Sequence, residues 1–191
     1  AGLSLKWLRD SLYPQESYQS LADAAFHVRP GAEGVFFLPH LSGERTPHMD
    51  PQAKAAFVGL ALHHERGHLA RAVMEGVVMA LKRGLDIMLD LGVPLKRIVA
   101  SGGGTRHPLW LQLQADIFNQ PIYCSTTVEA AAVGAAILAG KGIGIFSDLV
   151  ESSQEIAHRS DQVIYPLPEN SRYYEKSYQT FCQLHPALRG Y

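Results

Sequence analysis

The stretch that decides the fold is RIVASGGGTRHPLWLQLQADIFNQPIYCS at residues 97–125. Its apolar start predicts a strand that runs into three glycines. The segment 107–118 has helical spacing of apolar residues, with Pro108 in the first turn, where proline is tolerated. A second short strand is expected at 121–125. A strand, a helix and a strand in succession predict an α/β layer structure.

Working outward, the same spacing rules predict further elements on both sides. The expected helices cover 3–10, 17–28, 64–91 and 128–140, and the expected strands cover 35–41 and 55–62 with a polar loop at 42–51 between them. Gly92 and Pro94 end the longest helix. The remaining segment, 147–191, is richer in charge and aromatic residues. We expect it to form a peripheral helical tail with a break at 165–170.

The glycine turn Gly102-Gly103-Gly104 is the first candidate binding feature. Glycines let a ligand approach the backbone closely, and the helix that follows would point free N–H groups and the positive end of its dipole at the same place. That combination favours a phosphate group. The alternative is a tight strand-to-helix turn without a ligand. The turn matches neither the Walker A pattern nor GxGxxG.

Composition excludes several classes of protein. The chain has 191 residues, is 47% hydrophobic, and carries 17 basic and 18 acidic residues for a net charge of −1. A protein that binds nucleic acid should have a basic excess, so neither nucleic acid nor a membrane is an expected partner. Cys124 and Cys182 are too few for a disulfide scaffold, and reduced thiols in a cytoplasmic protein are the simpler interpretation. Residue 1 is not Met, so we expect a segment of a longer chain.

A second candidate site has a different chemistry. His64-Glu65-Arg66-Gly67-His68 matches HExxH, in which two histidines on one helix face hold Zn²⁺ and the glutamate acts as the base of a hydrolase. Gly67 weakens the helix within this motif, and the motif lies at the start of the expected helix. The alternative is a group of histidines, partly packed and partly solvated, at a helix end.

A longer pattern resembles the C-terminal signature of the FGGY carbohydrate kinases. The residues that match it in order are Ala55, Phe57, Gly59, Leu60, His68, Leu69, Ala72, Val73, Met74 and Glu75. The loop LSGERTPHMDP at 41–51, the turn and helix at 101–122, and VEAAAVGAAILAG at 128–140 are also similar to segments of this family. The resemblance covers most of residues 1–145, and it assigns His68 to the signature rather than to zinc.

The resemblance implies a fold and a binding site. The fold is a ribonuclease H-like (actin-like ATPase) domain, a mixed sheet flanked by helices. Residues 1–191 would form the C-terminal nucleotide-binding domain of a two-domain kinase whose N-terminal sugar-binding domain lies outside this chain. Gly102, Gly103 and Gly104 would contact ATP through their backbone, and His107 falls at a position where relatives place a residue that contacts adenine.

The resemblance also implies a reaction. The complete enzyme would transfer the γ-phosphoryl group of Mg²⁺-bound ATP to a sugar hydroxyl, and GERTP with the segment 64–76 is most similar to the xylulokinase branch of the family. D-xylulose is therefore the expected substrate, and gluconate, ribulose and glycerol are the alternatives. No catalytic base or metal ligand is expected on this chain, whose partners would be ATP, a small sugar, its own N-terminal domain and, in a homodimer, a second copy. A non-catalytic actin-like module is the remaining alternative.

Other conspicuous side chains have expected structural roles. We expect Asp116 to be a packing or helix-surface residue, and Trp110 and Phe118 to belong to the core. Glu44 and Arg45 are expected to form a local ion pair beside their loop, and the alternative is that Arg45 contacts a phosphate. Glu129 falls in the first turn of the helix expected at 128–140, where a carboxylate is favourable.

Overall fold

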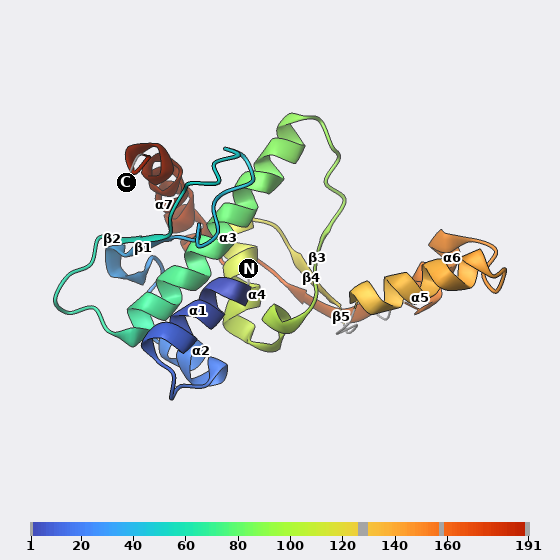
Figure 1. Ribbon diagram of the computed structural model, residues 1–191, viewed down its shortest axis with the longest axis horizontal. Coiled ribbons are helices and arrows are strands. Elements are labelled where there is room, and N and C mark those ends of the chain that lie inside the picture. Colours follow the sequence, from blue (N-terminus) through green and yellow to red (C-terminus); the bar gives the residue numbers. More distant parts are fainter. Residues whose placement is uncertain (1, 126–129, 157–158, 190–191) are drawn as a thin grey trace.

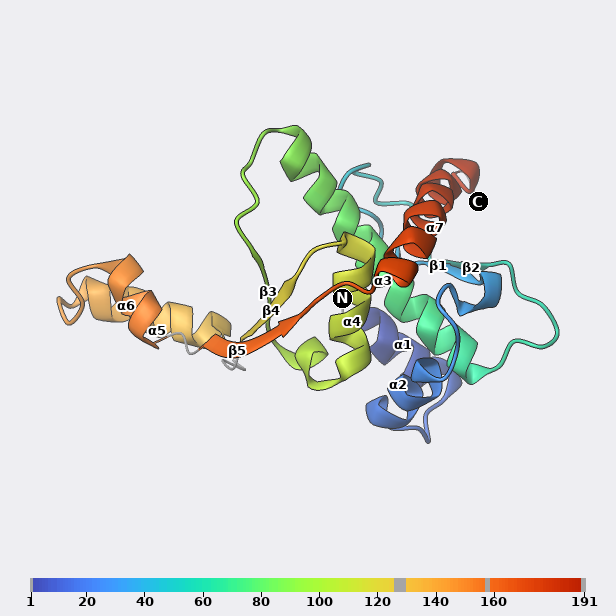
Figure 2. The same cartoon turned by 180° about the vertical axis from the view of Figure 1, so that it is seen from behind.

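The computed structural model describes residues 2–125, 130–156 and 159–189. Its elements are, in chain order, α1 (Gly2–Leu12), α2 (Tyr18–Phe26), β1 (Phe36–Leu38), β2 (Ala56–Val58), α3 (Arg66–Asp90), β3 (Ile98–Ala100), α4 (Pro108–Phe118), β4 (Ile122–Ser125), α5 (Ala130–Gly142), α6 (Leu149–Ile156), β5 (Arg159–Ile164) and α7 (Pro168–Ala187). Figures 1 and 2 show a body with α3 at its centre and an arm, α5 with α6, that projects from it. The helices and strands expected before residue 142 are confirmed within a few residues at their ends. Glu129 lies outside the described residues.

The main sheet is mixed, as predicted. β3 pairs parallel with β4, with Val99 opposite Tyr123, and β4 pairs antiparallel with β5. β1 and β2 form a separate antiparallel pair, joined by the polar loop. α4 connects β3 to β4, because two parallel strands need a crossover between them.

The centre of the body is the middle of α3, which is buried on every side. Residues 70–79 of this helix are all buried. A Cβ atom on Gly76 would lie 2.0 Å from the carbonyl oxygen of Phe37 in β1, a distance that no side chain tolerates. Gly76 therefore allows α3 to pack directly on the backbone of β1.

The expected peripheral tail at 147–191 is partly wrong. β5 is the third strand of the main sheet, and α7 packs into the core through Tyr174 and Phe181, which are 1% and 2% exposed. α7 begins at Pro168, inside the expected break. Its apolar residues form one narrow stripe among many polar ones, so overall composition conceals a buried helix. Only α6 fits the description of a peripheral helix among the described parts of this segment.

Asp116 holds the start of α7 in place through hydrogen bonds. This side chain is 2% exposed, and it accepts hydrogen bonds from the backbone N–H of Leu167 at 2.8 Å and from the side chain of Asn170 at 2.7 Å. Gln112 donates to the same carboxylate at 2.7 Å. The prediction of a packing role for Asp116 is confirmed, and Phe118 is buried as expected.

A buried polar network joins α3 to α7. Oε1 of Glu75 accepts hydrogen bonds from Arg71 Nε at 2.7 Å, the Tyr174 hydroxyl at 2.6 Å and the Gly31 N–H at 2.9 Å. Arg71 also donates to the Val28 carbonyl at 2.7 Å. Burial raises the pKa of Glu75, and the three donors on its oxygen act against that shift. The network satisfies the polar groups that the close packing of α2, α3 and α7 removes from water.

Cys124 and Cys182 are both free thiols. Among the described residues, no helix is long and apolar enough to cross a membrane.

Candidate functional site

A groove of about 960 Å³ lies between two walls that are distant in sequence. One wall is the end of β3, the glycine turn and the start of α4, and it includes the predicted residues Gly103, Gly104 and His107. The other wall is formed by α1 and the start of α2, with contributions from Lys6 and Tyr18. The predicted nucleotide-binding turn therefore faces a cavity of the size that small-molecule ligands occupy.

The three positions of the glycine turn differ in whether the backbone conformation requires glycine there. Gly102 has φ 80° and ψ −166°, a backbone conformation that is open essentially to glycine alone. Gly103 and Gly104 lie in a short 3₁₀ turn with ordinary backbone angles, and a Cβ atom on either would meet nothing within 4 Å. The fold needs glycine at 102. At 103 and 104, the absence of a side chain leaves the space in front of the backbone open to the groove.

The expected source of the free N–H groups is corrected by the structure. The Leu109 N–H at the start of α4 donates to Nδ1 of His107 at 3.1 Å, and Pro108 has no N–H to offer. Hydrogen bonding in the preceding turn begins with the Thr105 N–H, which donates to the Gly102 carbonyl at 3.1 Å. The first N–H groups of a helical turn have no partner within it. The donors available to an anion are therefore those of Gly103 and Gly104, and not those of α4.

His107 has a structural role in this wall. It is 8% exposed and caps α4 through Nδ1, while its Nε2 lies 3.2 Å from Oδ1 of Asp23 in α2. Both ring nitrogens thus have partners within the protein. The contact of His107 with adenine stays a prediction, since only the rest of the ring is available for it.

The charged residues of the groove were not identified from the sequence. Lys6 projects from α1 and forms an ion pair with Asp10 one turn along the same helix, and Arg106 ends the glycine turn. Trp110, expected in the core, packs against it with part of its ring and lines the groove with the rest. No local pattern could have identified Lys6. It reaches the groove only because the fold places α1 opposite the glycine turn, which lies about one hundred residues further along the chain. Among the described residues that line the groove, none is a carboxylate.

The HExxH motif has a structural explanation. Glu65 is the N-cap of α3 and forms a capping box with His68, whose Nδ1 accepts the Glu65 N–H at 3.0 Å. His64 precedes the helix, and its Nδ1 accepts the Ala61 N–H at 2.7 Å. The two imidazoles are therefore not on one helix face, as zinc binding would require. The described residues contain no group of three or more His, Cys, Asp or Glu side chains placed to hold a metal ion, so the structure does not support a zinc hydrolase.

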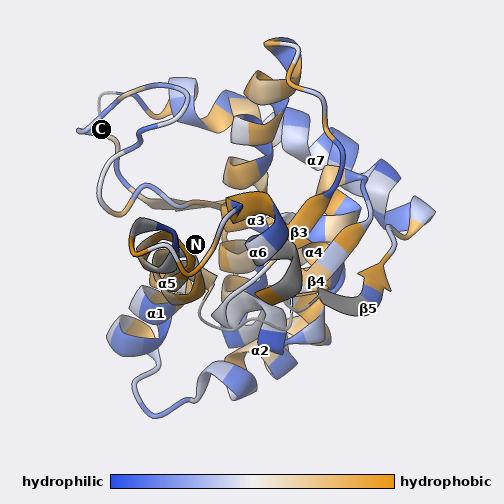
Figure 3. Ribbon diagram, turned by 90° about the vertical axis from the view of Figure 1, so that its right-hand side faces the viewer, coloured by the Kyte–Doolittle hydropathy of each residue, from blue (hydrophilic) through white to orange (hydrophobic). Residues whose placement is uncertain are grey.

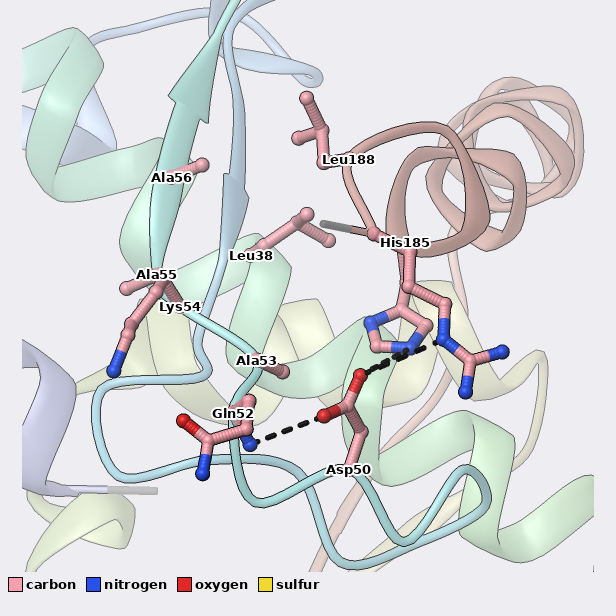
Figure 4. Close-up of a pocket in the computed structure, with 10 residues that line it drawn as sticks. Leu38, Asp50, Gln52, Ala53, Lys54, Ala55, Ala56, His185 and Leu188 are labelled. Atoms are coloured by element: carbon pink, nitrogen blue, oxygen red, sulfur yellow. Dashed lines mark hydrogen bonds and ion pairs between the residues drawn. The ribbon is translucent and has the colours of Figure 1, made fainter. Parts of the chain in front are cut away.

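A smaller pocket of about 430 Å³ lies between the loop before β2 and the end of α7 (Figure 4). Asp50 lines this pocket, and its Oδ2 lies 3.8 Å from Nε2 of His185 and 4.0 Å from Nε of Arg189. His48 stacks on His185 with the ring centres 4.2 Å apart. These contacts attach the loop to α7. Glu44 in the same loop is buried and accepts the His48 N–H at 2.7 Å, so its role is local. Among the described residues it forms no ion pair with Arg45, and that part of the expectation is wrong.

Comparison with known proteins identifies the family. The "FGGY family of carbohydrate kinases, C-terminal domain" matches residues 1–143. A xylulose kinase of Staphylococcus epidermidis is 40% identical over 181 residues, which are 95% of this chain and 36% of that protein. The crystal structure of ligand-bound xylulose kinase from Lactobacillus acidophilus has a TM-score of 0.84 and 32% identity, and gluconate kinase from the same organism has 0.83 and 31%.

The match to those two crystal structures covers the whole of this chain and 38% of each of the longer chains. This chain therefore spans less than two-fifths of the length of these relatives. The structural agreement over its full length confirms the predicted actin-like fold, and the sequence match covers both the glycine turn and the signature that contains His68 and Glu75. The chain belongs to the FGGY family of carbohydrate kinases, in the C-terminal domain of that family.

Proposed function

We propose that this chain provides the ATP-binding groove of a carbohydrate kinase. The observation that carries the proposal is the open space in front of Gly103 and Gly104, which line a groove although the backbone does not require glycine at either position. A phosphate oxygen could approach their N–H groups without meeting a Cβ atom. Family membership supports the same function, because its members are carbohydrate kinases.

The charge and shape of the groove fit a nucleotide. Lys6 and Arg106 place positive charge on both walls, and the lining residues contribute no carboxylate to oppose it. Tyr18 and Trp110 add aromatic surface that suits a purine base. We infer that the triphosphate lies toward the glycine turn and that Lys6 releases Asp10 to meet it.

In the proposed reaction, the hydroxyl oxygen of a sugar attacks the γ-phosphorus of ATP. The bond from that phosphorus to the oxygen that bridges it to the β-phosphate breaks, and ADP leaves with the electron pair. The hydroxyl proton needs a base, and Mg²⁺ needs oxygen ligands beyond the phosphates. The described residues that line the groove include no carboxylate to act as the base or as a ligand of Mg²⁺, so we place both carboxylate roles in other parts of the polypeptide.

D-xylulose is the substrate that we propose first. The supporting observation is that relatives 40% and 32% identical to this chain are xylulose kinases. Gluconate is the principal alternative, because the gluconate kinase structure matches almost as well. Steady-state kinetics of the complete polypeptide with both sugars would decide between them. A kcat/KM at least about tenfold higher for D-xylulose is expected, and the reverse order would reject the assignment. The two free cysteines fit a cytoplasmic enzyme.

The experiment that tests the groove is a titration with Mg-ATP, followed by the backbone amide NMR shifts of the chain. Saturable shifts should appear at residues 101–106 and in α1, and Gly103→Asp should abolish them because its carboxylate fills the open space and repels phosphate. Gly84→Asp is the matched control, since Gly84 lies on α3 outside the groove lining with nothing within 4 Å of its Cβ position. The same titration on the complete polypeptide shows whether binding needs the rest of the enzyme. No binding to either preparation would reject the proposal and favour a non-catalytic module.

A further inference from the structure

His107 lies at the junction between the glycine turn and the helices beside it. Its backbone ends the turn that contains Gly103 and Gly104 and begins α4, and its side chain is buried. At Nδ1 the ring accepts the Leu109 N–H at 3.1 Å. A ring nitrogen that accepts a hydrogen bond carries no proton, so in the neutral ring the proton is on Nε2.

The partner of that second nitrogen is Asp23 in α2, a helix that lies below α4 in Figure 3. Nε2 of His107 is 3.2 Å from Oδ1 of Asp23, and the proton on Nε2 makes the ring the donor. The same Oδ1 accepts a hydrogen bond from Nε2 of Gln19 at 3.0 Å. Gln19 lines one wall of the groove and His107 lines the other. One carboxylate oxygen thus joins the two walls, although Asp23 is not itself a lining residue.

Neither charge nor stability explains why an aspartate occupies this position. A carboxylate beside the groove repels the phosphate groups of ATP. The Asp23 side chain is 57% exposed, and ion pairs in contact with water contribute little to stability. Orientation is the effect that the geometry favours, because a ring that is held at both nitrogens cannot turn about its bond to the backbone.

We propose that Asp23 is a positioning residue of the ATP groove. It holds the His107 ring in the orientation in which Nδ1 caps α4, and His107 in turn fixes the end of the glycine turn. Within the turn, Thr105 donates to the Gly102 carbonyl through its N–H at 3.1 Å and its hydroxyl at 2.8 Å. The turn is therefore closed on itself and anchored at its end by His107. Asp23 acts through that anchor on the two glycine N–H groups that face phosphate, so this proposal rests on the proposed function.

The test is the dissociation constant of Mg-ATP for the complete polypeptide, measured by isothermal titration calorimetry. Asp23→Ala should weaken binding by about threefold to fivefold, because the ring loses one of its two hydrogen bonds. Removal of the negative charge alone would have the opposite sign and would strengthen binding. Asp23→Asn should return the constant to within about twofold of the unaltered value, because its carboxamide oxygen still accepts the Nε2–H. Asp90→Ala is the matched control, since Asp90 is an exposed aspartate on α3 outside the groove lining, and it should leave the constant unchanged.

Two further measurements separate a loss of positioning from a general loss of structure. The melting temperature of Asp23→Ala should stay within about 3 °C of the unaltered protein, because the side chain is half exposed. His107→Ser keeps a residue that can cap α4 but breaks the connection to α2. In that background, Asp23→Ala should weaken ATP binding no further. An equal loss with and without His107 would overturn the proposal.

A spectroscopic readout of the same contact needs no ATP. The Nε2–H of His107 should give a ring N–H proton signal in the NMR spectrum, identified by its absence from His107→Ser. Asp23→Ala should remove this signal because the proton then exchanges with water, and Asp23→Asn should retain it. A missing signal in the unaltered polypeptide, or an affinity for ATP that Asp23→Ala leaves unchanged or raises, would overturn the positioning role alone. A polypeptide that shows the signal but does not bind ATP would reject the proposed function, and the positioning role with it.

Discussion

α3 and α5 are both rich in small and apolar residues, but they have opposite environments. α3 has charged residues along its length, yet residues 70–79 are buried because α2, β1, α4 and α7 pack around it. α5 has an almost uninterrupted apolar sequence, and most of its residues are accessible to solvent. The comparison shows that burial depends on which elements are present to cover a helix. The hydrophobicity of the helix itself only sets how much free energy is gained when other elements cover it.

The substitution with the largest expected effect on stability is Gly76→Ala in α3, and it tests why this helix is buried. The new Cβ atom would lie 2.0 Å from the Phe37 carbonyl oxygen, so α3 and β1 would have to separate. We expect the free energy of unfolding to fall by about 3 kcal/mol or more, measured by urea denaturation. Gly84→Ala is the control in the same helix, where nothing lies within 4 Å, and it should stabilise by about 0.5–1 kcal/mol. Similar effects at the two positions would show that close packing on β1 is not what buries α3.

Tyr174→Phe tests the polar part of the packing around α3. It removes the hydroxyl that donates to Glu75 at 2.6 Å and accepts from Arg71 at 3.0 Å, and it leaves both partners buried. We expect a loss of about 2 kcal/mol in the free energy of unfolding. Tyr173→Phe, at an exposed neighbouring ring, should change it by less than about 0.5 kcal/mol. A neutral result for Tyr174→Phe would mean that the network contributes nothing to holding α7 against α3.

Acid should weaken the body and leave the arm unaffected. Burial, followed by the nearby His185, lowers the pKa of His40, and burial followed by Arg83 lowers that of His48, while Glu44 opposes both shifts. The folded state therefore favours neutral rings. Its stability is fully present above the ordinary histidine pKa of about 6.5, and it decreases as the pH falls below that value because the unfolded chain takes up protons first.

The measurement is the free energy of unfolding at pH 7.5 and at pH 5.5. His48→Gln should reduce the difference between the two values, because it removes one of the rings with a lowered pKa. Hydrogen exchange should place the acid-induced opening at the loop 41–54 and the end of α7. A stability that is the same at both pH values would contradict the prediction. Opening confined to α5 and α6 would reverse the comparison between the body and the arm.

The smallest expected effect is at the exposed end of the arm. Ile143→Ala should change the free energy of unfolding of the 191-residue chain by less than about 0.5 kcal/mol. Val78→Ala in α3, at a side chain with no exposure, should cost about 2 kcal/mol. Both can be measured by urea denaturation. A large loss for Ile143→Ala would show that α5 already has a partner in this chain.

Much of the local structure could be predicted because its signals are short-range. Helical spacing identified α3 and α4, Pro108 marked the start of α4, and the glycines after β3 marked the turn. The prediction failed for α7, whose apolar stripe is visible only once its partners in α3 and α4 are known. It also placed the phosphate-binding donors on α4, where the His107 cap had already taken the Leu109 N–H. At such positions side-chain caps and short turns compete for the same backbone N–H groups, and only the three-dimensional structure shows which one forms.

The candidate site was half predictable for the same reason. Gly103, Gly104 and His107 belong to one continuous segment, so a motif could indicate them. Lys6, Tyr18 and Trp110 complete the groove, but only the packing of α1 and α2 brings the first two near the turn.

The sequence by itself thus determined the type of each early element, the position of the glycine turn and the family, because these depend on neighbouring residues and on a long ordered pattern. The tertiary structure alone decided the opposite wall of the groove, the burial of α7 and the exposure of α5. Those depend on contacts between segments far apart in the chain, and such contacts form only when the apolar surfaces that share them are brought out of water together.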